Sequence, residues 1–144
     1  LNSTKSVARP IDVLDAHIYG GDVALARANY AEARKLWEAA LQISQTSSVK
    51  AKECVTLARL GKLCMQEGKI PEAEKFLEQA LQVASGYRES TLKGYVYEQL
   101  AYLAAAKGQN QQASTYGEKC LEVYDQMQLR EAANFRKWLY SIYK

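Results

Sequence analysis

Apolar side chains recur along the chain with the spacing of a helix that buries one face. Ala33, Leu36, Trp37, Ala40 and Leu41 stand at positions i, i+3, i+4, i+7 and i+8, with mostly charged or amide side chains beside them. This pattern indicates an amphipathic helix whose apolar stripe faces a core. The segment that contains it, NYAEARKLWEAALQIS, returns as KIPEAEKFLEQALQVA at an offset of 40 residues. The chain therefore carries an internal repeat.

A third, fainter copy with the same offset is QNQQASTYGEKCLEVY. Small residues recur upstream of the three copies, where Gly21, Gly61 and Ala101 each lie 12 positions before an aligned alanine. Two helices approach closely where one offers Gly or Ala and a larger side chain of the other fills the space. Each repeat is therefore predicted to be a pair of helices joined by a short turn, at Gly68 and Gly108 in the last two repeats.

In these features the chain resembles the tetratricopeptide repeat family, which has a Leu–Gly or Leu–Ala pair in its first helix and an Ala, large residue, Ala set in its second. The matching residues are Leu60, Gly61, Ala73, Leu77 and Ala80 in the middle repeat, Leu100, Ala101, Ala113 and Cys120 in the third, and Gly21, Ala33, Trp37 and Ala40 in the first. The period departs from the family's usual 34 residues. We assign the additional residues to longer first helices.

The resemblance implies an all-α fold, a right-handed superhelical array of antiparallel helix pairs with a C-terminal capping helix. We expect residues 1–144 to form a single domain, with repeats at about 11–46, 47–86 and 87–127 and a last helix at about 128–144. That last helix either caps the array or opens a fourth repeat. Gly117 stands where the other repeats have a large residue, and we expect Trp138 or Phe135 to fill the space; the alternative is a small pocket there.

The resemblance also implies a concave wall lined mainly by first helices, where a peptide or a partner's helix can lie. The predicted partner-binding residues are Val55, Ala58, Arg59, Lys62, Met65, Tyr95, Glu98, Gln99 and Tyr102, with Ile18, Asp22 and Leu25 as a weaker set in the first repeat. The alternative is that the tyrosines pack against the next helix and the charges are solvated. Repeat domains that bind acidic chaperone tails carry a clamp of Lys and Asn at these positions. Only Lys62 could serve here, so such a clamp is not expected.

Composition and charge argue against several classes of partner and site. The net charge is +3, and basic and acidic residues alternate, as in EARK and EAEK, so we expect no nucleic-acid partner. No apolar run approaches 18 residues, so we expect no membrane span. Cys54, Cys64 and Cys120 are odd in number and lack a CxxC spacing, which argues against disulfides and zinc. We expect buried thiols in a reducing compartment and a cytoplasmic protein.

No residue pattern indicates catalysis, since His17 has no Cys nearby and the chain has neither a nucleophile elbow nor a phosphate-binding glycine loop. We predict a non-enzymatic scaffold or adaptor without cofactor or metal that binds a peptide or partner helix in its groove. Two alternatives stay open. One is a sensory or regulatory domain excised from a larger transcriptional or signalling protein, which the absent start Met favours. The other is a homodimer that forms through the aromatic C-terminal helix, with Trp138, Tyr140 and Tyr143 at the contact.

Overall fold

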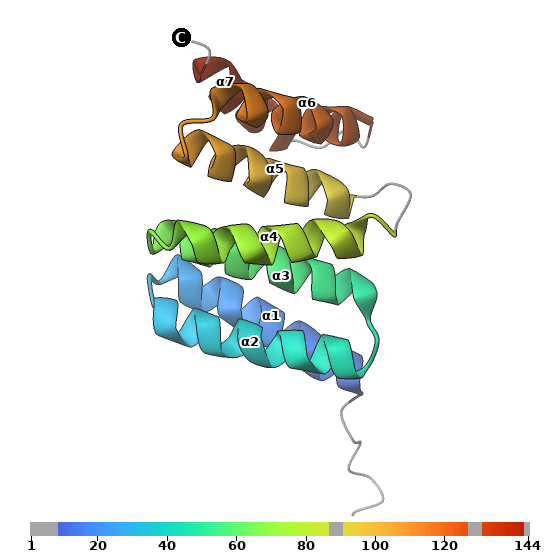
Figure 1. The fold of residues 1–144 in the computed structure, drawn as a ribbon. Coiled ribbons are helices and arrows are strands. Elements are labelled where there is room, and N and C mark those ends of the chain that lie inside the picture. Colours follow the sequence, from blue (N-terminus) through green and yellow to red (C-terminus); the bar gives the residue numbers. More distant parts are fainter. Residues whose placement is uncertain (1–8, 87–90, 127–130, 143–144) are drawn as a thin grey trace, which may run out of the picture.

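The computed structural model describes residues 9–86, 91–126 and 131–142. Within these residues the chain forms seven α-helices and no β-strand, which confirms the predicted all-α helical-repeat class. The helices are α1 (Pro10–Ala26), α2 (Tyr30–Thr46), α3 (Lys50–Gln66), α4 (Ile70–Ala84), α5 (Thr91–Ala106), α6 (Asn110–Gln126) and α7 (Glu131–Ser141). They stack in chain order, from α1 and α2 at the bottom of Figure 1 to α7 at the top.

The turns inside the repeats have one shared backbone conformation. Ala28, Gly68 and Gly108 occupy the same turn position and have φ angles of 59°, 77° and 77°. Glycine adopts this left-handed region without strain, which explains the predicted turns at Gly68 and Gly108. The second helices then begin as expected, because the Asn29 side chain accepts a hydrogen bond of 3.3 Å from the Glu32 amide and Pro71 lies in the first turn of α4.

Consecutive helices form the pairs α1/α2, α3/α4 and α5/α6, and each pair packs on the next. The second helix of one pair contacts the first helix of the following pair, as α2 does α3 and α4 does α5. The first helices also contact one another directly, α1 with α3 and α3 with α5. One wall of the stack is therefore built from α1, α3 and α5.

Small and large residues complement each other across each helix pair. A Cβ atom on Gly21 would collide with the indole of Trp37, and one on Gly61 would lie 2.7 Å from Cγ and Cδ2 of Leu77. The Trp37 and Leu77 side chains are fully buried, and the Trp37 indole N–H donates a hydrogen bond of 3.1 Å to the Ile18 carbonyl. The absence of a Cβ at the two glycines is thus what lets α1 approach α2 and α3 approach α4.

In the third repeat the small residue Gly117 lies on α6, and the large side chain beside it comes from α7. A Cβ atom on Gly117 would lie 2.6 Å from Cδ1 of Leu139, so α7 fills the space beside Gly117. The expectation that Trp138 or Phe135 fills it was right about the helix and wrong about the residue. Those two rings turn instead toward Tyr102 of α5, with centroid distances of 4.5 Å and 5.7 Å. Helix α7 therefore covers both α5 and α6.

Candidate functional site

The wall formed by α1, α3 and α5 carries three hollows that share lining residues. The first, of 460 Å³, lies between α3 and α5 and is lined by Val55, Arg59, Thr91, Leu92, Tyr95, Glu98 and Tyr124. The second, of 470 Å³, reaches α1 and is lined by Asp22, Leu25, Ala26, Trp37, Arg59, Lys62, Gln66 and Tyr95. The third, of 440 Å³, is lined by Lys62, Met65, Gln66, Glu98, Gln99, Tyr102 and Ala106. Shared residues make them one continuous surface, which we call the groove.

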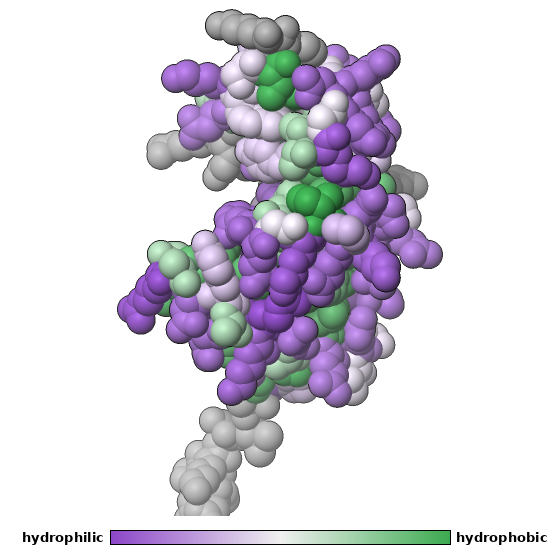
Figure 2. Space-filling model, turned by 60° about the vertical axis from the view of Figure 1, so that its left-hand side comes forward, coloured by the Kyte–Doolittle hydropathy of each residue, from purple (hydrophilic) through white to green (hydrophobic). Residues whose placement is uncertain are grey.

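The face of the molecule drawn in Figure 2 is mostly hydrophilic, with limited apolar areas. In Figure 2 purple residues dominate the visible face, green residues show in separate areas, and the outline is indented at the left between the lower and upper parts of the stack. Large apolar side chains are exposed at only three described positions, Tyr19, Tyr30 and Tyr140. The lining of the groove combines charged side chains such as Arg59 with apolar ones such as Leu92.

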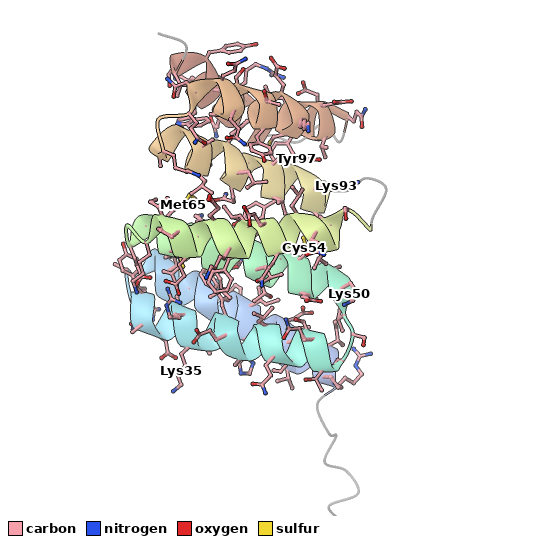
Figure 3. All side chains as sticks on the ribbon, viewed as in Figure 1. Lys35, Lys50, Cys54, Met65, Lys93 and Tyr97 are labelled. Carbon is pink, nitrogen blue, oxygen red and sulfur yellow. The ribbon has the colours of Figure 1, made fainter. Side chains whose placement is uncertain are left out.

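The structure places eight of the nine predicted partner-binding residues on the groove and one beneath it. Ala58 is fully buried in the core between α3, α4 and α5, so it cannot contact a partner. Gln99 lines the third hollow but is only 2% exposed, so it forms the floor of that hollow. In Figure 3, Met65 lies near the α3–α4 turn, at a height between α4 and α5 in that view.

Arg59 connects the three helices of the wall. Its guanidinium donates hydrogen bonds of 2.6 Å and 3.2 Å to the Asp22 carboxylate on α1, and it lies 5.6 Å from the ring centroid of Tyr95 on α5. Burial alone would lower the pKa of Arg59, but the hydrogen bond with Asp22 and the electrostatic interactions with Tyr95 and Asp22 together outweigh it, so the pKa is raised. A bidentate pair with an added cation–π contact has fixed geometry, so it braces the wall.

Tyr95 is shielded from water on the same part of the wall. Burial raises the pKa of Tyr95 to about 12, although the positive charge of Arg59 acts in the opposite direction. The phenol is therefore neutral at any physiological pH. Tyr95 lines the first two hollows and offers an aromatic surface to a ligand rather than a charge.

Glu98 is held by two phenol hydroxyls. Tyr124 of α6 donates a hydrogen bond of 2.6 Å to Oε1 of Glu98, and Tyr102 donates one of 3.3 Å to Oε2. Burial raises the pKa of both tyrosines, and the carboxylate of Glu98 raises both further. Both phenols therefore stay protonated and keep the carboxylate in place between the first and third hollows.

The residues predicted for self-association have separate environments. The Trp138 ring is half-buried and stacks on Phe135 at 5.5 Å, so much of it serves the contact between α7 and α5. Tyr140 is 57% exposed on α7. Tyr143 lies outside the described residues.

Several lining residues were missed by the sequence analysis. Leu92 could have been found, because it lies one helical turn before Tyr95 and continues the spacing of the predicted positions. Gln66 lies one helical turn beyond Lys62 on α3. Tyr124 carried no such signal, because α6 comes next to Glu98 only through the packing of the two helices.

The three cysteines are buried free thiols, as predicted, and Cys54 donates a hydrogen bond of 3.4 Å to the Ala80 carbonyl where α3 faces α4 (Figure 3). Burial raises the pKa of Cys54 to about 12. Within the described ranges there is no group of three or more His, Cys, Asp or Glu that could hold a metal ion. Nor is any helix in this part of the chain long and apolar enough to cross a membrane.

Comparison with known proteins agrees with this architecture. The tetratricopeptide repeat model matches residues 15–83 and 52–126. The crystal structure of BtubC (BKLC) from P. vanneervenii is similar, with a TM-score of 0.72 and 18% sequence identity. The similarity covers 86% of this chain and 50% of that one, so the chain spans about half the length of BtubC. At that identity the likeness shows the fold alone. No curated protein matches the sequence.

Proposed function

Because the chain belongs to the tetratricopeptide repeat family, whose repeats generally mediate protein–protein interaction, we propose that it is a non-enzymatic scaffold that binds a segment of a partner protein in the groove. The groove is the surface where first helices of all three repeats meet, and an extended concave surface of this kind suits a peptide or a single helix. The observation that carries the proposal is the continuity of the three hollows through Arg59, Lys62, Gln66 and Glu98.

The groove also has the side chains that binding surfaces use. Arg and Tyr are enriched among the residues that dominate binding energy. Here Arg59 is already fixed by its hydrogen bonds to Asp22, and Tyr95 lies against the Arg59 guanidinium. A pre-ordered side chain loses less conformational entropy when a partner binds. Tyr102 is likewise fixed, by Glu98 and by the α7 rings.

The same contacts decide how the proposal should be tested. Alanine at Tyr95 or Tyr102 would remove packing between helices as well as groove surface, so a loss of binding would be ambiguous. Gln66 is a better site, because it is exposed and lines two of the hollows. Gln79 of α4 is a matched control, since it is the same residue type, is exposed and lines none of them.

The experiment replaces each glutamine in turn by a photo-crosslinking amino acid and irradiates the chain in an extract of cells that produce it. The expected result is a protein adduct at position 66 that is absent at position 79, with the crosslinked peptide mapped by mass spectrometry. An adduct at position 79 alone, or equal adducts at both positions, would move the binding surface away from the groove and refute the proposal.

Self-association through α7 is a second proposal, favoured by the 57% exposure of Tyr140. A dimer contact at this site would bury the phenol ring. Sedimentation velocity over a range of concentrations is expected to show a dimer for the parent chain and a weaker one for Tyr140→Ser. A parent chain that stays monomeric at the highest concentration would exclude this second proposal.

A further inference from the structure

We propose that the groove selects partner segments that carry one acidic and one basic side chain, the acidic one for Lys62 and the basic one for Glu98. This inference rests on the proposed function, because it names the chemistry of a segment bound in the groove. It rests on which charged side chains of α1, α3 and α5 have an opposite charge beside them.

Most charges on the wall are compensated within the chain. The Arg59 guanidinium is paired with Asp22 at 2.6 Å, and the Lys52 ammonium is paired with Asp15 at 2.9 Å. Both pairs join α3 to α1. Each neutralises itself locally, so neither pair leaves a net charge for a partner.

Lys62 and Glu98 differ from these pairs. Among the residues that the structure describes, Lys62 forms no ion pair with a carboxylate and Glu98 forms none with a cation. The only side-chain hydrogen bonds of Glu98 in this part of the chain come from two neutral phenols, those of Tyr102 and Tyr124. The groove therefore presents one positive and one negative group, each without an opposite charge beside it among the described residues.

The positions of the two groups give the groove a polarity. Lys62 lines the second hollow, toward α1, and Glu98 lines the first, toward α6. Both also line the third hollow, where they do not pair with each other. Both side chains are half-buried, so an approaching opposite charge is screened less than it would be on an open surface.

A partner segment of one sign only would satisfy one group and face repulsion from the other. A segment with both signs satisfies both, because complementary potentials across an interface favour the right partner and like charges disfavour the wrong one. The two tyrosines strengthen this argument, since they hold the Glu98 carboxylate without neutralising it. Glu98 can therefore form an ion pair with a basic side chain of the partner without moving.

The test selects peptides from a random library displayed on phage against the full chain. The binding site of each selected peptide is located first, with the variants Gln66→Cys and Gln79→Cys, each carrying a bulky maleimide label. A groove peptide loses binding when position 66 is labelled and keeps it when position 79 is labelled. A library that gives no peptide blocked in this way overturns the proposed function, and the inference with it.

Charge is tested next on the groove peptides. We expect them to contain both an acidic and a basic residue, and to lose about tenfold or more in affinity for Lys62→Gln and for Glu98→Gln. Glutamine at position 98 can accept a hydrogen bond from one tyrosine through its oxygen and donate one to the hydroxyl oxygen of the other through its NH2 group. The substitution therefore removes the charge and keeps a hydrogen bond to each tyrosine. The double variant Lys62→Glu/Glu98→Lys should prefer a peptide whose two charges are exchanged.

The results that refute the inference leave the proposed function intact. Groove peptides that carry one sign of charge, or that bind the two glutamine variants as tightly as the parent chain, would overturn it. Circular dichroism and the melting temperature establish that each variant is folded. If Glu98→Gln does not fold, the Lys62→Gln variant and the composition of the selected peptides still test the inference. Selected peptides without acidic residues, or an unchanged affinity for Lys62→Gln, would refute it.

Discussion

Gly61 of α3 packs against Leu77 of α4. This contact predicts that Gly61→Ala changes the free energy of unfolding in opposite directions with and without the Leu77 side chain. Gly61 is buried, Leu77 is fully buried, and a Cβ on Gly61 would lie 2.7 Å from two side-chain carbons of Leu77. Gly61→Ala in the parent chain forces these atoms apart. Gly61→Ala combined with Leu77→Ala does not, because the second substitution removes both carbons.

The magnitudes follow from two opposing contributions. An added methyl group in a filled core costs about 1–3 kcal/mol, and replacing glycine by alanine inside a helix gains about 1 kcal/mol. Gly61→Ala alone should therefore destabilise by about 1 kcal/mol, while Leu77→Ala alone should cost about 2–5 kcal/mol. In the Leu77→Ala background only the helix gain remains, so Gly61→Ala should stabilise by about 1 kcal/mol. The coupling energy between the two sites is then about 2 kcal/mol.

Urea unfolding of the four chains, followed by circular dichroism, measures this coupling. Gly68→Ala is a control, because nothing lies within 4 Å of its added Cβ and its cost comes from a φ of 77° alone. It should destabilise equally in both backgrounds. If Gly61→Ala shifts stability by the same amount and in the same direction whether or not Leu77 is present, close packing is not the reason for glycine at position 61.

Four further measurements follow from individual residues. Ala28 has a φ of 59° at the turn position that is glycine in the other repeats. Ala28→Gly should relieve about 1–2 kcal/mol of backbone strain and lose about 0.4–1 kcal/mol through the freer unfolded chain, so the melting temperature should rise. A lower melting temperature would contradict this. Leu139→Ala should cost about 2–5 kcal/mol and speed hydrogen exchange in α7 first, whereas uniform protection would show that α7 does not depend on this contact. Because the pKa of Tyr95 rises from 10.0 to about 12 on folding, the stability given by the neutral phenol is present below pH 10 and lost as the pH rises to about 12. Urea midpoints of Tyr95→Phe should therefore fall less over that range than those of the parent chain. With its pKa at about 12, the Cys54 thiol should react with a thiol reagent near neutral pH only after urea unfolds the chain, and rapid labelling of the native chain would refute its burial.

The sequence predicted more of the fold than of the groove, as the turns and the interior residues show. Helix spacing, turn glycines and small residues at Gly21 and Gly61 are local signals, since each depends on residues within one helix pair. Their consequences were confirmed, including the large partners Trp37 and Leu77. The groove residues came from the same spacing, which gives the face of a helix but not how closely the next helix covers it. Ala58 shows the difference, because α3 and its neighbours bury it completely.

The repeated array of helix pairs can be read from the amino-acid sequence, because a stripe of apolar residues and a 40-residue period are properties of the chain alone. The side chains that meet across the array cannot, because they depend on how the helices pack. Leu139 rather than Trp138 fills the space beside Gly117, and Tyr124 reaches Glu98 from a different helix. Both depend on the rotation and offset of helices distant in sequence, which are fixed when their packed surfaces meet rather than by the pattern along either helix.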